Sequence, residues 1–368
     1  MKLSSVVNRI NGNVDRFTTD LKYYIGGEHF ESNELAITKK GLLKENLNIL
    51  GFKFHFAFQE RDVIFMARNP HLRKAGMVMF SGLCSDASYI LRSKDENILT
   101  QEFLAVQLQS DHFWDYCESH KVGSVNFANN WSSIANYEFD LPPIEVQRKI
   151  GEKVWAAYRV KESYKKLLAA TDDMLKAKFM EMFGEEGKIT LESIASSWSK
   201  GQSFSKNDIV DEGNTPCIHY GKLYKYGYVI NNVFSATNAS AKTTSIKGDI
   251  LFPASDVTPK GLARCSCIDL DGVILGGDII VMHPIQGINP TYLSYAINQQ
   301  TNQLLQLVTG SVVRHMSAKS LKTVKVPLPP LPLQQQFVEI ATQAEATKES
   351  LRKSIENIDQ VIKSLINQ

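Results

Sequence analysis

The amino-acid sequence contains an internal repeat of two related copies, and this repeat is the strongest constraint on the fold. When the chain is shifted along itself by 187 residues, Leu141-Pro142-Pro143 falls on Leu328-Pro329-Pro330. At the same shift, Gly123-Ser124-Val125 falls on Gly310-Ser311-Val312. Repeats that stack into extended arrays have periods of about 20 to 50 residues, so a period this long indicates a duplicated domain. We therefore expect two copies of one unit, each a globular part followed by a helix.

The segment after each proline block carries a heptad pattern of apolar residues. Its equivalent polar pairs are Gln147 and Gln334, Lys161 and Lys348, and Asp172 and Asp359. Apolar residues alternate at spacings of four and three over about four heptads, which is typical of a coiled-coil seam. The predicted seam residues are Ile150, Val154, Ala157, Tyr164, Leu168 and Leu175 in the first copy, and Phe337, Ala341, Leu351, Ile355, Ile358, Ile362 and Leu365 in the second. Lys161 and Lys348 occupy the same seam position and would help to fix the register.

We expect these two helices to pair with each other in an antiparallel coiled coil. Each covers roughly 30 to 35 residues, or about 45 to 50 Å at 1.5 Å per residue. The alternative is that each helix docks only on its own globular domain. That alternative is disfavoured because helices in globular proteins average about 11 to 12 residues. The antiparallel pairing would hold the two globular parts at a fixed spacing.

Composition agrees with two soluble domains. The chain has 368 residues, of which 43% are hydrophobic and 22% charged, so each copy can bury its own core. No run of eighteen apolar residues occurs, and the segment 1–5 leads into no apolar stretch, so we expect a cytoplasmic protein. The predicted division is 1–142, 143–183, 184–329 and 330–368, in which globular parts alternate with helices.

The cysteines fit a reducing compartment. They are Cys84, Cys117, Cys217, Cys265 and Cys267, and no CxxC pair occurs among them. Cys265 and Cys267 would share one face of a strand. We interpret them as small apolar residues, because a metal site would need more ligands nearby.

The globular parts 1–140 and 184–327 predict an α+β fold, a twisted sheet or distorted barrel with helices packed on one side. Short apolar runs broken by turns predict strands at 63–66, 76–80 and 88–91 in the first copy, and at 249–252, 262–265 and 278–282 in the second. Apolar spacing of three and four predicts helices near 101–118 and 290–307.

Catalytic signatures do not stand out. Asn69-Pro70-His71-Leu72 is close to the Asn-Pro-Pro-aromatic loop of adenine methyltransferases, but it lacks the second proline and the aromatic residue that stacks on a flipped base. No GxGxxG, GxxxxGK[ST] or HExxH pattern occurs. We therefore expect a binding and scaffolding protein with no catalysis of its own, and with neither a metal nor a cofactor in this chain.

These features resemble the specificity (S) subunit of type I restriction-modification systems. The resemblance covers essentially the full length, and it is most specific at the paired Leu-Pro-Pro-x-x-x-Gln blocks at 141–147 and 328–334. It implies two target recognition domains that each read one half of a split double-stranded DNA target, separated by two helices in an antiparallel coiled coil. It also implies partners: methyltransferase subunits, two of them expected, which bring S-adenosylmethionine, and restriction subunits, which use ATP and Mg²⁺. The loop at 198–206 has only a weak counterpart in the first copy, at 11–13.

The formal net charge of +2 is small for a protein that grips DNA unaided, so we expect the isolated chain to bind DNA poorly. Interleaved basic, polar and tyrosine residues in loops are the candidates for DNA contact. They are Arg68, Arg73, Lys74, Lys121 and Asn126 in the first copy, and Lys200, Gln202, Ser203, Lys206, Lys222, Tyr224, Lys225, Tyr226, Lys260 and Arg314 in the second. Two other interpretations stay open: a protein-binding scaffold without DNA recognition, and a single-chain methyltransferase or nuclease.

Overall fold

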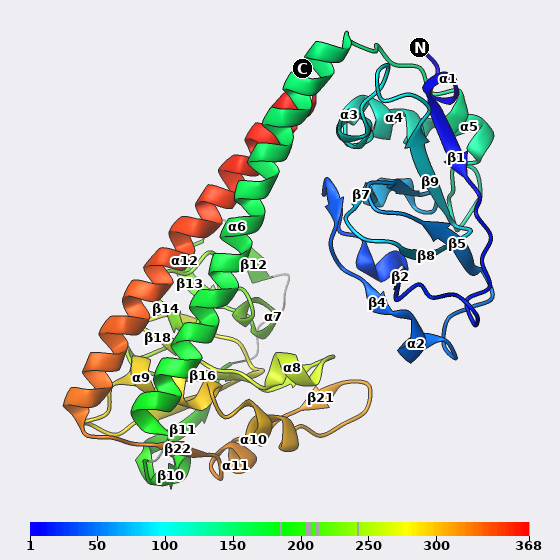
Figure 1. Cartoon of the computed structure of the whole chain (residues 1–368). Coiled ribbons are helices and arrows are strands. Elements are labelled where there is room, and N and C mark those ends of the chain that lie inside the picture. The colour runs from blue at the N-terminus through cyan, green and yellow to red at the C-terminus, as the bar shows by residue number, and fades with distance from the viewer. Residues whose placement is uncertain (185, 203–207, 211–212, 241–242, 368) are drawn as a thin grey trace. The chain divides into compact units, whose positions relative to one another are not determined.

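The computed structural model describes the chain except for residues 185, 203–207, 211–212, 241–242 and 368. It divides into two compact units. Unit 1 consists of Met1–Leu168 together with Ser350–Gln368, and unit 2 is Ala169–Glu349. The boundary cuts the two long helices, α6 (Ile144–Phe183) and α12 (Leu331–Ile366), so each unit contains one globular domain and a segment of both helices (Figure 1).

Unit 1 contains two sheets. The first has the strand order β1-β9-β6-β7-β3, and the second has the order β4-β2-β8-β5. The strands are β1 (Val7–Ile10), β2 (Tyr23–Ile25), β3 (Ala36–Ile37), β4 (Gly41–Leu42), β5 (Phe54–Phe58), β6 (Val63–Met66), β7 (Ala75–Val78), β8 (Gly82–Ser85) and β9 (Ser88–Ser93). The helices of the domain are α1 (Leu3–Val6), α2 (Leu43–Asn46), α3 (Gln101–Gln107), α4 (Asp111–Ser119) and α5 (Trp131–Ala135), with 3-10 turns η1 (Gly27–His29) and η2 (Pro70–Leu72).

Unit 2 repeats this plan. Its larger sheet has the order β11-β20-β16-β18-β14, a second sheet has the order β12-β15-β13-β19, and β10-β22 and β17-β21 form two short ladders. The strands are β10 (Lys188–Thr190), β11 (Ala195–Lys200), β12 (Ile209–Val210), β13 (Thr215–Ile218), β14 (Val229–Ile230), β15 (Ala236–Thr237), β16 (Ile250–Pro253), β17 (Ser255–Asp256), β18 (Ser266–Ile268), β19 (Ile274–Leu275), β20 (Ile279–Pro284), β21 (Arg314–His315) and β22 (Lys325–Pro327). The helices are η3 (Leu191–Ile194), α7 (Tyr220–Leu223), α8 (Pro259–Leu262), α9 (Pro290–Asn298), α10 (Thr301–Gln306) and α11 (Ala318–Leu321).

The duplication extends to strand direction. β6 is antiparallel to β9, as β16 is to β20, and the edge strand is parallel to its neighbour in both units, β3 to β7 and β14 to β18. In the smaller sheets β2 is parallel to β8, and β13 is parallel to β19. The predicted α+β class with a twisted sheet and helices is confirmed. Among the described residues, the sheets stay separate and none closes into a barrel.

The central strand of each larger sheet is buried on both faces. Side chains alternate across a strand, so neighbouring residues enter different layers. Val63 and Phe65 pack into one core of unit 1, whereas Ile64 packs into another on the opposite face. In unit 2, Phe252 and Leu251 divide between two cores in the same way. A continuous apolar run without alternation is therefore what a strand between two layers requires.

Most predicted elements lie where the pattern indicated, and one strand does not. Predicted 63–66 is β6, 88–91 lies in β9, and the helices near 101–118 and 290–307 are each broken into two. The strand predicted at 262–265 was wrong, because Thr258 caps α8 there through a hydrogen bond from Gly261. After α8, the main-chain N–H of Cys265 donates to the side chain of Asn298, at Oδ1 and 3.1 Å, and not to a neighbouring strand. Hence Cys265 lies outside the strand that holds Cys267.

The long helices pair in opposite directions within each unit. In unit 1, Lys161 Nζ of α6 lies 2.6 Å from Asp359 Oδ1 of α12. In unit 2, Lys348 Nζ of α12 lies 2.6 Å from Asp172 Oδ1 of α6. Each of the predicted seam residues is buried or half-buried. The two ion pairs join residues that are equivalent in the repeat, because Lys161 corresponds to Lys348 and Asp359 corresponds to Asp172.

No helix in the described part of the chain is long and apolar enough to cross a membrane.

Candidate nucleic-acid interface

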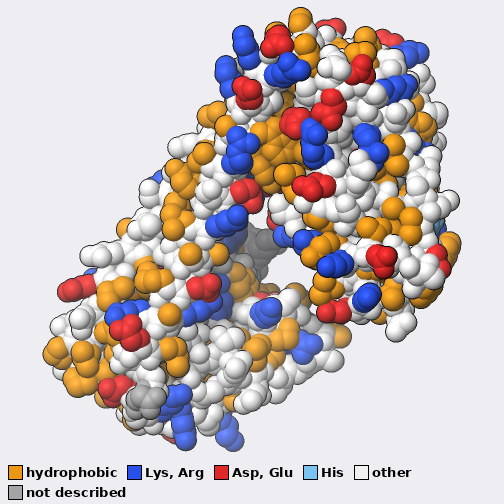
Figure 2. Space-filling model, in the orientation of Figure 1, with side chains coloured by type: hydrophobic (Ala, Val, Ile, Leu, Met, Phe, Trp, Pro, Cys, Tyr) orange, Lys and Arg blue, Asp and Glu red, His pale blue; other side chains and the backbone are white. Residues whose placement is uncertain are grey.

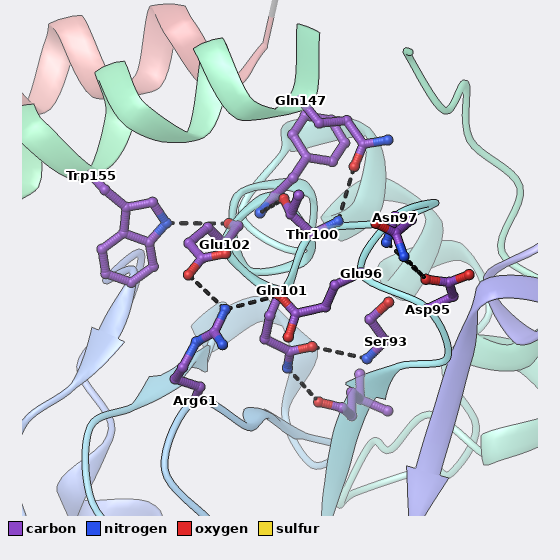
Figure 3. Close-up of polar contacts among 12 residues, drawn as sticks. Arg61, Ser93, Asp95, Glu96, Asn97, Thr100, Gln101, Glu102, Gln147 and Trp155 are labelled. Atoms are coloured by element: carbon purple, nitrogen blue, oxygen red, sulfur yellow. Dashed lines mark hydrogen bonds and ion pairs between the residues drawn. The ribbon is translucent and has the colours of Figure 1, made fainter. Parts of the chain in front are cut away.

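The glutamine of each Leu-Pro-Pro-x-x-x-Gln block joins a long helix to its recognition domain. Gln147 is 1% exposed, and its Oε1 accepts the main-chain N–H of Thr100 at 3.1 Å (Figure 3). Its Nε2 donates to the carbonyl of Ile98 at 2.8 Å. Gln334 is 2% exposed and accepts the N–H of Asn289 at 2.9 Å. Thr100 and Asn289 are themselves the N-caps of α3 and α9. The repeated glutamine thus ties the long helix to the globular domain, and its burial removes it from the surface.

A further set of polar contacts surrounds the start of α6 in unit 1. Figure 3 shows Trp155 of α6 pointing toward α3, where its Nε1 donates to the carbonyl of Glu102 at 3.2 Å. Arg61 lies below and pairs with Glu96 at 3.0 Å and with Glu102 at 2.9 Å. These contacts hold the helix against the domain, and Figure 2 shows apolar surface bordered by basic and acidic side chains on this face of unit 1.

The seam lysines differ in their remaining partners. Lys161 also lies 2.9 Å from Glu34, a residue of the first recognition domain, and Lys165 pairs with the same carboxylate at 2.9 Å. Lys348 instead pairs with Glu345 of its own helix at 2.9 Å. Burial opposes the charge of Lys348, but its hydrogen bonds to the two carboxylates outweigh burial and raise its pKa.

Among the predicted DNA contacts of unit 1, three are engaged inside the unit. Arg73 pairs with Asp111 at 2.6 Å, Lys74 donates to the carbonyl of Gly27 at 2.8 Å, and Lys121 pairs with Glu118 at 2.6 Å. Two are exposed. Arg68 forms an isolated bridge to Ala128, and Asn126 lies in the turn between Val122 and Ala128.

In unit 2 the basic candidates remain largely at the surface. Lys225 and Lys260 are exposed and Lys222 is half-buried, whereas Lys200 lies 3.9 Å from Asp278. Arg314 is half-buried, and its guanidinium donates to the carbonyl of Gly310 at 3.1 Å.

The uncharged candidates of unit 2 mostly hold the domain together. Gln202 donates to the carbonyl of Ser240 at 2.9 Å. Tyr224 donates to the carbonyl of Ser255 at 3.2 Å, and burial together with the Asp256 carboxylate raises the pKa of Tyr224. Tyr226 is 8% exposed and accepts the N–H of Phe234. The two remaining candidates, Ser203 and Lys206, lie outside the described residues.

The cysteines are buried free thiols. Burial raises the pKa of Cys84, Cys265 and Cys267 to about 12 in each case, so these side chains stay neutral and pack as small apolar groups. No group of three or more potential metal ligands occurs within the described ranges.

One polar arrangement in unit 2 was missed by sequence reasoning. His283 Nδ1 lies 2.6 Å from Asp249 Oδ1, and its Nε2 lies 3.1 Å from Ser199 Oγ. The order Ser, His, Asp is that of a hydrolytic triad.

The equivalent site in unit 1 indicates that the Ser199–His283–Asp249 arrangement is structural. Asp62, the repeat equivalent of Asp249, binds Arg92 Nε at 2.7 Å, and an arginine cannot act as a general base. Both aspartates also accept a main-chain N–H three residues earlier, from Gln59 and from Ile246. The sequence could have predicted this shared turn, because Asp62 and Asp249 align in the repeat.

Comparison with known proteins identifies a family and similar folds for this chain. The family model described as "Type I restriction modification DNA specificity domain" matches residues 6–168 and 185–360. A search of curated proteins finds no significant match. A solved structure titled for complex assembly and conformational transition of the type I R-M system is 19% identical, covering 100% of this chain and 95% of that one, with a TM-score of 0.58. The type I restriction-modification S subunit from M. genitalium is 13% identical, covering 100% and 94%, also with a TM-score of 0.58. These two likenesses concern the fold.

Two matches of the family model, covering most of the chain, show that the protein belongs to the type I restriction-modification DNA specificity family and is a non-catalytic DNA specificity subunit.

Proposed function

We propose that the globular domain of each unit reads one half of a bipartite double-stranded DNA target. The observation that carries this proposal is that one sheet topology occurs twice, each time joined to a long helix by an equivalent buried glutamine. The proposed division is 1–142 and 184–329 for the recognition domains, and 143–183 and 330–368 for the helices.

The DNA contacts we propose are the candidates that remain accessible. In unit 1 these are Arg68 and Asn126, and in unit 2 they are Lys222, Lys225, Lys260 and Arg314, with Lys200 held only by a long ion pair. Arg73 would have to break its 2.6 Å ion pair to reach DNA, and Tyr226 is buried, which weakens the case for both.

Partner subunits supply the rest of the activity in this proposal. Two methyltransferase subunits would bring S-adenosylmethionine and part of the phosphate grip, and restriction subunits would bring ATP and Mg²⁺. The net charge of +2 supports this division, because phosphate contacts dominate the affinity of proteins for DNA. The free thiols support a reducing cytoplasm.

The test is exchange of one recognition domain. Residues 184–327 are replaced by the equivalent segment of another S subunit, and the methylated motif of cells that express the complex is sequenced. One half of the motif should change and the other should stay. A change in both halves would contradict independent reading. Wild-type complex that shifts no duplex in a mobility assay would favour the protein-binding scaffold instead.

A further inference from the structure

Each unit exposes the same three-residue loop tip, and neither the fold nor target specificity explains the identity of its serine and valine. The tips are Gly123-Ser124-Val125 and Gly310-Ser311-Val312. Val125 is 83% exposed and Val312 is 80% exposed, whereas a valine normally gains stability from burial. Two domains that read different half-sites would share exposed residues only for a task common to both.

The two tips have the same local construction. Gly123 and Gly310 have φ angles of +109° and +93°, a region that glycine adopts without strain. A Cβ atom on Gly123 would lie 2.7 Å from the carbonyl oxygen of Asn126, and one on Gly310 would collide with the carbonyl oxygen of Val313. The glycine is therefore explained by the turn, but the following serine and valine are not.

Equivalent hydrogen bonds anchor both tips. The main-chain N–H of Asn129 donates to the carbonyl of Ala67 at 2.9 Å, and that of Met316 donates to the carbonyl of Ala254 at 3.0 Å. Each tip is closed by a two-way bridge, between Val122 and Ala128 in unit 1 and between Thr309 and His315 in unit 2. In Figure 1 the loop before β21 extends beyond the sheets of unit 2. Both tips are thus held outward by the same framework.

The chemistry of the tips suits a phosphate backbone. Within the described contacts, the main-chain N–H groups of residues 124–126 and 311–313 donate no hydrogen bond to the chain. Serine hydroxyls and main-chain amides are common phosphate ligands, and apolar side chains enter minor grooves. Positive charge lies beside each tip: exposed Arg68 bridges Ala128, and α8, which carries exposed Lys260, packs against β21.

We infer that the two Gly-Ser-Val tips grip the DNA sugar-phosphate backbone in the same way at both half-sites, without reading bases. This inference rests on the proposed function. A protein partner is the less favoured occupant, because each tip offers one isolated valine, and protein interfaces are built around larger apolar or aromatic cores.

The experiment uses the full chain assembled with its methyltransferase subunits. Val125→Asp and Val312→Asp place a carboxylate at each tip, alone and together, and Ile49→Asp is the matched control at another exposed apolar position, 77% exposed, in unit 1. Affinity is measured for the cognate duplex and for duplexes with either half-site changed, together with the methylated motif and the assembly of the complex.

Each tip variant should weaken binding to all duplexes by the same factor, roughly tenfold, because the added carboxylate would repel the phosphate that the serine hydroxyl and main-chain amides of the tip bind. The double variant should weaken binding roughly a hundredfold, because sites in separate units that share no partner are expected to act additively. The motif and the assembly should not change. A changed motif would make the tip a base reader, loss of methyltransferase subunits would make it a protein-docking site, and an effect no larger than that of Ile49→Asp would remove the contact altogether. Absence of specific methylation by the wild-type complex would instead count against the proposed function.

Discussion

The two junctions between coil and recognition domain share an ion pair and a buried glutamine, but they differ in the other partners of the seam lysine and in their apolar contacts. Lys161 binds Asp359 across the coil and Glu34 of its domain. Lys348 makes the equivalent bond to Asp172, but its second carboxylate is Glu345 of its own helix. The bond between the helices is thus common to both units. Lys161 binds a domain carboxylate directly, whereas Lys348 is linked to its domain through Glu345, which accepts the hydroxyl of Tyr295 at 3.2 Å.

The apolar contacts differ in the opposite sense. In unit 2, Phe337 packs against Phe179 and Phe183 of α6 and against Tyr292 and Tyr295 of α9. The repeat equivalent of Phe337 in unit 1 is Ile150, which is only half-buried. Unit 2 is therefore attached to the coil mainly by aromatic packing, and unit 1 by a mixture of packing and charge. A shared pair of helices tolerates two different attachments.

The largest expected effect is loss of the aromatic attachment. Phe337→Ala should destabilise unit 2 by about 3 to 5 kcal/mol, because the side chain is fully buried and leaves a cavity. Ile150→Ala, the matched change in unit 1, should cost about 1 to 2 kcal/mol because less area is lost. Alkylation of Cys265 in unit 2 and Cys84 in unit 1 during urea titration reports each unit separately, since both thiols are buried. Equal destabilisation by Phe337→Ala and Ile150→Ala would contradict the proposed difference between the two attachments.

Removal of the seam lysines should give the reverse order. Lys161→Met removes one of the two ammonium groups that pair with Glu34, whose side chain is 12% exposed; Lys165 remains, so the cost should be about 2 kcal/mol, below that of a fully unpaired buried charge. Lys348→Met leaves carboxylates that are 51% and 37% exposed and should cost about 1 kcal/mol. Thiol alkylation again reports each unit, and the cost of Lys161→Met should persist in 1 M salt more than that of Lys348→Met. A larger cost for Lys348→Met would show that the domain carboxylate adds nothing.

The repeated glutamines should behave alike. Gln147→Ala and Gln334→Ala each leave a buried main-chain N–H unpaired, so each should destabilise its own unit by about 1 to 3 kcal/mol. Gln147→Glu and Gln334→Glu keep the acceptor for that N–H and lose the donor, so they separate the two halves of the contact. If the losses in free energy of unfolding differ between the units by more than about 1 kcal/mol, the two glutamine contacts are not equivalent.

The smallest expected effect is the pH dependence of the Asp249 site. Burial raises the pKa of Asp249 above its ordinary value of 3.8, although the N–H of Ile246 and the imidazole of His283 oppose this. The folded state then holds the proton more tightly than the unfolded chain, so this contribution to stability is fully present below pH 3.8 and is lost as pH rises through the raised pKa.

Asp249→Asn removes that titration. The variant should therefore gain stability relative to wild type as pH rises through this window, measured by urea unfolding of unit 2 at a series of pH values. Asp62→Asn is the comparison in unit 1, and it should lose stability at neutral pH because it breaks the pair with the always-charged Arg92. A pH-independent difference between wild type and Asp249→Asn would contradict the assignment.

The repeat and the heptads were readable from sequence because both are periodic. Buried residues recur along α6 and α12 at the predicted seam, and the strand at 63–66 was found because a strand between two layers is apolar throughout. Side-chain capping gives no periodic signal. The strand predicted at 262–265 was therefore wrong. Helix α8 begins at Pro259, and Cys265 binds the side chain of Asn298.

The candidate interface was less accessible to prediction than the fold. Lysines and arginines in loops look alike in sequence, and only the structure separates Arg73, which pairs with Asp111, from the exposed Arg68. The same limit applies to Tyr226, whose burial depends on distant chain segments.

The division of the long helices between the units has a consequence for synthesis on the ribosome. Unit 2 is one continuous stretch, Ala169–Glu349, whereas unit 1 needs Ser350–Gln368 in addition to Met1–Leu168. Domains usually fold in the order in which they emerge, the N-terminal one first. Here we expect completion of unit 1 to wait until residues 350–368 have emerged, because Ile362 belongs to its core. A chain truncated near its end would carry a finished second unit and an unfinished first one.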